Sequence, residues 1–336
     1  MTPAWLLLSL LGPAGPLGGQ GSSLAAAAAA SGRPRECMSS SRRALSRGPS
    51  VWEMARVPNL QRYCDLIAKA QAELPTAPEA AKQSAAEADR ALPGRAGPAV
   101  VMARAALALG ALDDAARHFE RARTLEPRSV EDPTTLHDLA RVLRRTGKLD
   151  ESLSVYRALV PRVDLLANAE SKVLVLLEAA HVAMAAPVHD ASAQSLRSRL
   201  DEAIAYLREA RQRPPTQLAK DVLLSLVLAL DRSGDRAQAD AALGDAQRAG
   251  AKPRVGPAPY LASPDEGLAL DALAAEGSDR AGAIKGWESY LQSPAGKGPW
   301  AAAARARLDV LKKGGSAPKS AAPADKPPAK KKKAAP

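Results

Sequence analysis

The densest group of side chains that could bind a charged ligand lies in the stretch HDLARVLRR, at residues 137–145. It contains His137, Arg141, Arg144 and Arg145. On a helix, Arg141 and Arg145 lie one turn apart, with Arg144 beside them. Guanidinium groups bind carboxylates through paired hydrogen bonds, so this group could hold an acidic peptide. The alternative is that an arginine-rich sequence simply places arginine on solvent-exposed helix faces.

Residue types that catalyse reactions or bind metals are present, but their spacing fits no catalytic or metal-binding motif. The sequence contains no glycine-rich phosphate loop, no zinc-protease helix and no nucleophile elbow. The histidines are scattered and have no partners at metal-ligand spacing: His118, His137, His181 and His189. We therefore expect a non-catalytic protein with no cofactor, no metal and no small-molecule substrate.

The only two cysteines are Cys37 and Cys64. They form neither a CxxC pair nor part of a Cys/His metal set. In an exported chain they would be disulfide partners, closing a loop of about 27 residues and contributing about 3 kcal/mol. Such a bridge would tie an N-terminal cap to the first helices. In a cytosolic chain they would be two unrelated thiols, and this alternative stays open.

The elements that must position these residues are short helices. Aromatic residues make up 3% of the chain and alanine and leucine dominate, which argues against a β sandwich or barrel. In the stretch 99–127, small and apolar residues recur at a spacing of three to four on both sides of Gly110. Gly110 favours a helix end, and Pro127 ends the second helix. Further along the chain, Asp132 should cap a helix that opens with Pro133, and Thr76 with Glu79 resembles a capping box.

The stretch 99–127 resembles the tetratricopeptide repeat family. The family pattern has small residues in both helices, a glycine before the turn, an Ala-x3-Phe pair and a final proline. This sequence matches it at Ala103, Gly110, Ala115, Phe119, Ala122 and Pro127. In addition, Pro93, Pro127 and Pro161 are 34 residues apart, which is the repeat length of the family. The resemblance implies an all-α, right-handed superhelical solenoid of helix-turn-helix repeats.

In this family the first helix of each pair lines a concave groove that binds protein segments. Carried over to this sequence, that arrangement predicts a set of inward-facing residues as the partner-binding surface: Arg104, His137, Arg141, Arg144, Arg145, Asp221 and Arg232.

The expected organisation is a signal peptide at 1–30, a cap region at 31–59, about five repeats at 60–293, a capping helix at 294–313 and a disordered basic tail at 314–336. The expected repeats are 60–93, 96–127, 134–161, 170–215 with an insertion, and 217–292, which holds the last two pairs. Trp287 and Trp300 are expected to seal the end of the stack.

The net charge of +11 lies mostly at the C-terminal end, where eight lysines and one aspartate follow residue 311. The run of Lys330, Lys331, Lys332 and Lys333 could bind nucleic acid or an anionic envelope polymer through charge alone. A solubilising tail without a partner is equally consistent with it.

These features favour a periplasmic or envelope scaffold that binds a protein segment in its groove, and the arginines of the groove suit an acidic segment. The alternative is a cytoplasmic repeat adaptor whose lysine tail binds nucleic acid or another polyanion.

Overall fold

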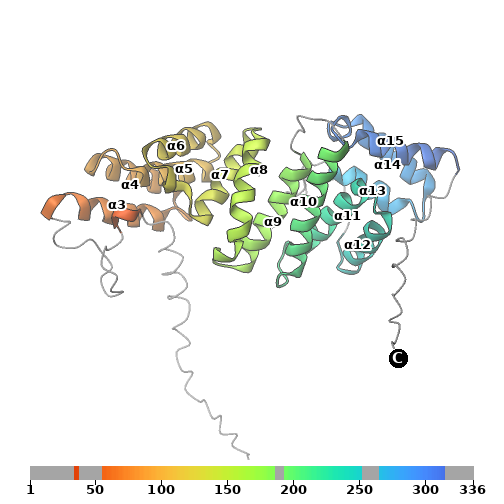
Figure 1. Ribbon diagram of the computed structural model, residues 1–336, viewed down its shortest axis with the longest axis horizontal. Helices are drawn as coiled ribbons and strands as arrows, with labels where there is room; N and C mark the ends of the chain where they lie inside the picture. The colour runs from red at the N-terminus through yellow and green to blue at the C-terminus, as the bar shows by residue number, and fades with distance from the viewer. Residues whose placement is uncertain (1–33, 38–54, 186–192, 252–264, 315–336) are drawn as a thin grey trace, which may run out of the picture.

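The computed structural model describes residues 34–37, 55–185, 193–251 and 265–314 of this chain. The expected signal peptide, most of the cap region, His189 and the run Lys330–Lys333 lie outside the described residues. The described part is an all-α solenoid in which helix pairs follow one another from one end to the other (Figure 1).

The described ranges contain six helix pairs and a final helix. The pairs are α3 (Leu60–Glu73) with α4 (Pro78–Ala91), α5 (Ala96–Ala108) with α6 (Leu112–Leu125), α7 (Pro133–Arg145) with α8 (Leu149–Leu159), α9 (Ala169–Ala185) with α10 (Ala193–Gln212), α11 (Ala219–Ser233) with α12 (Arg236–Arg248), and α13 (Glu266–Ala275) with α14 (Arg280–Gln292); α15 (Ala301–Lys312) closes the stack. Within the predicted repeat 170–215, which was expected to contain an insertion, α10 begins at Ala193.

Turns inside the pairs depend on glycine. Gly110, Gly147 and Gly234 have φ angles of 78°, 79° and 86°, in the left-handed region that other residues avoid. The predicted cap at Asp132 is confirmed, because its carboxylate accepts hydrogen bonds from the backbone of Thr134 and Thr135. The predicted capping box at Thr76 is wrong. Helix α4 starts at Pro78, and its N-cap residue makes no side-chain hydrogen bond.

Small side chains allow the helices to approach closely. Ala103 of α5 and Ala115 and Ala122 of α6 are fully buried, and Phe119 fills the space between them. Helix α9 is also apolar on all sides, and nearly every residue from Val173 to Met184 is buried. Such a helix must be enclosed by its neighbours.

The N-terminal end is closed by a strap of four residues, 34–37, which contains the short helix η1 (Arg35–Cys37). Cys37 is bonded to Cys64 of α3, with 5.5 Å between the Cα atoms. Tyr63 donates a hydrogen bond of 2.8 Å to Glu36. A side chain at Gly97 would lie 2.6 Å from both Pro34 and the Tyr63 hydroxyl, so glycine is required where the strap crosses α5.

Candidate partner-binding surface

We call the surface formed by the first helices of the second to sixth pairs the first-helix face; these helices are α5, α7, α9, α11 and α13. Charged residues on it link successive first helices. Arg104 of α5 pairs with Asp138 of α7 at 2.8 Å, and Arg232 of α11 pairs with Glu266 of α13. Both pairs span 34 residues in sequence. Each ion pair therefore joins the first helices of two neighbouring pairs.

Glu178 of α9 is the centre of a polar cluster on this face. Its side chain is 4% exposed, and Oε2 lies 2.7 Å from His137 Nε2 and accepts a 3.0 Å hydrogen bond from the Tyr156 hydroxyl. Arg141 and Arg144 approach Oε1 at 3.7 and 3.5 Å. Burial opposes the negative charge, but the contact with His137 and the two guanidinium groups outweigh it and lower the pKa of Glu178 to about 2. The carboxylate is therefore ionised at neutral pH.

Arg141 and Arg144 remain partly open to solvent, with 38% and 27% of their side chains exposed. Within the described ranges, Glu178 is the only carboxylate that forms an ion pair with either of them. Two guanidinium groups therefore share one buried carboxylate, which leaves positive charge at the surface. The contact with Glu178 also restricts their rotamers, so less entropy is lost when they bind a ligand.

The structure separates the other predicted contact residues. Arg145 is exposed but lines a different cavity, at the start of α6, together with Asp113 and Asp114. Asp221 lies in the first turn of α11, where burial raises the pKa of its carboxyl group.

Two of the predicted residues are too buried to be surface contacts. His137 is enclosed beside Glu178, and the side chain of Arg232 is only 4% exposed. We predicted both residues in an open groove because their spacing along the helix is that of the inward-facing residues of the repeat family. The sequence could not show that other parts of the chain cover that position.

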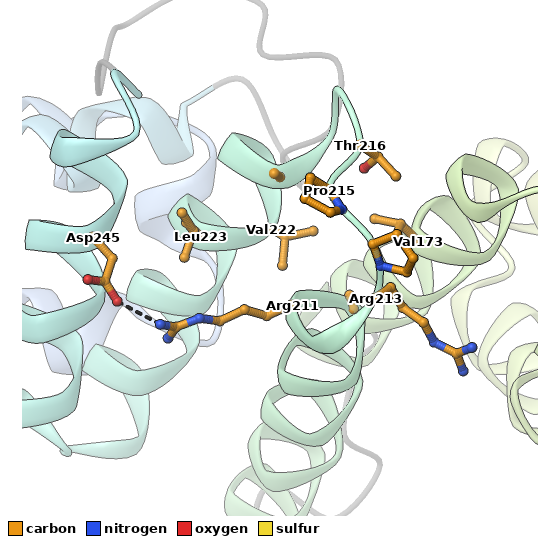
Figure 2. Close-up of a pocket in the computed structure, with 11 residues that line it drawn as sticks. Val173, Arg211, Arg213, Pro215, Thr216, Val222, Leu223 and Asp245 are labelled. Atoms are coloured by element: carbon orange, nitrogen blue, oxygen red, sulfur yellow. Dashed lines mark hydrogen bonds and ion pairs between the residues drawn. The ribbon is translucent and has the colours of Figure 1, made fainter.

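A second feature, absent from the sequence analysis, is an apolar pit of about 190 Å³ between α10, α11 and α12. The double proline that ends α10, Pro214 and Pro215, forms one wall, and Val173, Val222 and Leu223 form others. Figure 2 shows Arg211 reaching toward Asp245, at 2.8 Å, on one side of the pit. Its size suits one apolar side chain. The only sequence signal was the proline pair itself, which marks a break between helices.

Among the described residues, no group of three or more histidine, cysteine or acidic side chains could hold a metal ion. His181 is buried and its Nε2 lies 2.8 Å from the Ser225 hydroxyl, while burial lowers its pKa to about 3. No helix in the described ranges combines the length and apolar character needed to cross a membrane.

No family model matches the chain, and no curated protein is detectably similar to it in sequence. Among solved structures, the chain is similar to an assembly chaperone of RpL4 (Acl4), with 16% sequence identity and a TM-score of 0.43. The match covers 75% of this chain and 98% of that one. This TM-score is low, and the description of the solenoid rests on the helix pairs of the chain itself.

The depressed pKa of Glu178 predicts how stability depends on pH. A carboxyl group whose pKa falls from 4.5 to about 2 on folding stabilises the folded state fully above pH 4.5, and this contribution is lost as the pH falls toward 2. Replacing Glu178→Gln should lower the free energy of unfolding by about 2–3 kcal/mol at neutral pH and flatten its pH dependence below pH 4.5. Urea unfolding across that pH range measures both effects.

The matched control is Glu170→Gln, an exposed acid at the start of the same helix. It should change stability by less than about 0.5 kcal/mol. If Glu178→Gln kept the pH dependence of the unaltered chain, the ionised cluster would have no part in its stability.

Proposed function

We propose that this chain is a non-catalytic protein-interaction scaffold, which holds a segment of a partner protein against the first-helix face at α7. The observation that carries the proposal is the pair Arg141 and Arg144. Both are held near a buried carboxylate, yet both expose guanidinium groups with unbalanced charge. Such groups suit the carboxylates of an acidic peptide segment, since arginine binds them with defined geometry.

We also assign the helix pairs to the tetratricopeptide repeat class. Two observations support this assignment: the left-handed glycines at the turns Gly110, Gly147 and Gly234, and the 34-residue spacing of Pro93, Pro127 and Pro161. A solenoid of such pairs offers a long surface built from rigid helices. Proteins with this architecture use that surface to bind extended segments.

We also propose that the protein resides in the periplasm or cell envelope. The bridge between Cys37 and Cys64 supports it, because disulfides persist in oxidising compartments and are rare in the cytosol. The strap carried by this bridge ends the stack at α3, where an exposed apolar helix face would otherwise remain.

We expect neighbouring arginines of α7 to differ in how much they contribute to peptide binding. The probe is a short fluorescein-labelled peptide in which glutamate alternates with leucine, and its binding is followed by fluorescence anisotropy. The double variant Arg141→Ala with Arg144→Ala should bind it about tenfold or more weakly, because two charge-assisted contacts are lost. The control variant Arg145→Ala should stay within about twofold of the unaltered chain, because Arg145 lies at a different cavity. Equal losses in both variants, or no loss in the double variant, would remove this surface from consideration.

The compartment is tested by the intact mass of the protein isolated from its own host. We expect a chain that begins near Ser31 and gains the mass of two hydrogen atoms on reduction. A chain that retains residues 1–30 and has two free thiols would favour the cytoplasmic adaptor instead.

A further inference from the structure

The last turns of α9, α11 and α13 present acceptor groups that the helices themselves cannot satisfy. Met184 is in the last turn of α9, so its carbonyl oxygen has no partner within the helix. Asp231 lies in the last turn of α11, and Glu276 directly follows α13. Acidic side chains at these positions add to the negative end of the helix dipole. We call the surface formed by the Met184 carbonyl and the carboxylates of Asp231 and Glu276 the acceptor. It requires a positive charge and a hydrogen-bond donor.

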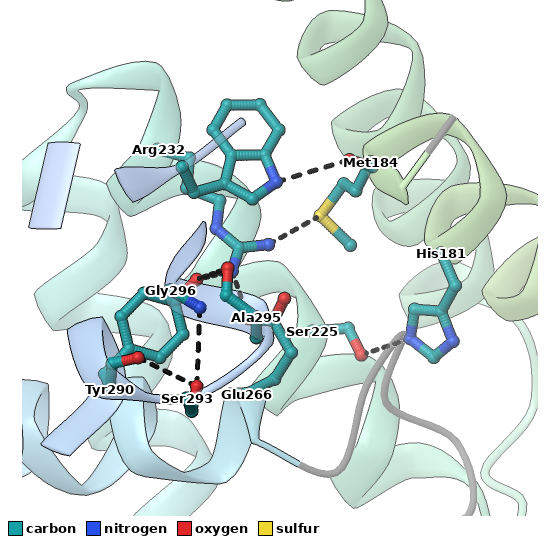
Figure 3. Close-up of polar contacts among 10 residues, drawn as sticks. His181, Met184, Ser225, Arg232, Glu266, Tyr290, Ser293, Ala295 and Gly296 are labelled. Carbon is teal, nitrogen blue, oxygen red and sulfur yellow. Dashed lines mark hydrogen bonds and ion pairs between the residues drawn. The ribbon is translucent and has the colours of Figure 1, made fainter. Parts of the chain in front are cut away.

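The C-terminal end of the chain supplies both. Trp300 is 8% exposed, and its indole N–H donates a 3.2 Å hydrogen bond to the Met184 carbonyl, 116 residues away in sequence. The Arg232 guanidinium lies 5.1 Å from the centre of the Trp300 ring, in cation–π geometry. Figure 3 shows Arg232 between Met184 and Glu266, at the centre of these contacts.

Arg307 of α15 completes the arrangement. It is 7% exposed and forms ion pairs with Asp231 of α11 and, at 2.6 Å, with Glu276 after α13. Burial lowers the pKa of Arg307 to about 10, so the group stays charged at neutral pH. One arginine thus forms ion pairs with two acids from different helix pairs.

Helix α15 depends on this docking. It has 12 residues, too few to be a stable helix alone in water. The connection from α14 contains Pro294, Gly296, Gly298 and Pro299, with η4 (Ala295–Lys297) as its only regular element. The position of α15 is therefore set by side-chain contacts, not by the stiffness of the connection.

We propose that the acceptor is a binding site for a helical segment that carries a tryptophan and, seven residues later, an arginine, and that the chain's own α15 is its built-in occupant. Residues seven apart lie on one face of a helix, two turns from each other. A partner segment with this pattern would compete with α15. This site is formed by the ends of α9, α11 and α13, whereas Arg141 and Arg144 belong to α7. It therefore does not depend on the function proposed above.

In the test, the segment that contains α15 is added to the full chain as a separate peptide. In the full chain with Trp300→Ala and Arg307→Ala, the acceptor is intact but its own occupant lacks both key groups. A labelled synthetic peptide of residues 294–314 should bind this variant at least tenfold more tightly than it binds the unaltered chain. A peptide carrying Trp300→Ala and Arg307→Ala should bind the variant at least tenfold more weakly than the natural peptide does.

The matched control peptide carries Arg305→Ala, which removes an exposed arginine from the same helix and should bind like the natural peptide. If the double variant does not fold, the full chain with Arg307→Ala alone, which keeps Trp300, takes its place. Equal binding of the natural peptide to variant and unaltered chains, or no binding to either variant, would overturn the proposal. Binding of the acidic peptide at Arg141 and Arg144 reports separately on the other site.

Discussion

The structure depends on one constraint: a pair of short helices cannot bury both of its faces by itself, so each pair is stable only against its neighbours. Alanine at the crossings satisfies the apolar part of this requirement, and ion pairs between first helices satisfy the polar part. The ion pairs Arg104–Asp138 and Arg232–Glu266 each join residues 34 apart in sequence. His137 and Glu178, which also join two first helices, are 41 residues apart.

The first-helix face has two halves that differ in how far their arginines are exposed to solvent. One half lies around α7, and the other lies around α11 and α13. Around α7, two arginines share one buried carboxylate and remain open to solvent. Around α11 and α13, Arg232 is paired with Glu266, stacked against Trp300 and covered. An arginine of a first helix is thus a candidate contact around α7 and part of the core around α11 and α13. The difference arises because Trp300, which lies just before α15, covers Arg232.

Much of the architecture could be predicted because it follows from local rules. The glycine turn at Gly110 and the cap at Asp132 depend on residues close in sequence. The capping box at Thr76 failed because Ala77 and Pro78 begin the helix instead. The site was less predictable, since it depends on distant contacts. Glu178, the only acid in an apolar stretch, was a usable signal for a buried ion pair. The link from Trp300 to Met184 spans 116 residues and leaves no local pattern.

The central claim is that partner segments contact the open half of the first-helix face. The most direct measurement is photocrosslinking of the full chain with the peptide of alternating glutamate and leucine, carrying a benzophenone group, followed by mass spectrometry of the digested product. The account predicts crosslinks within α7, near Arg141 and Arg144, and none within α11 or α13. Crosslinks confined to α11 and α13, or spread evenly along the solenoid, would contradict it.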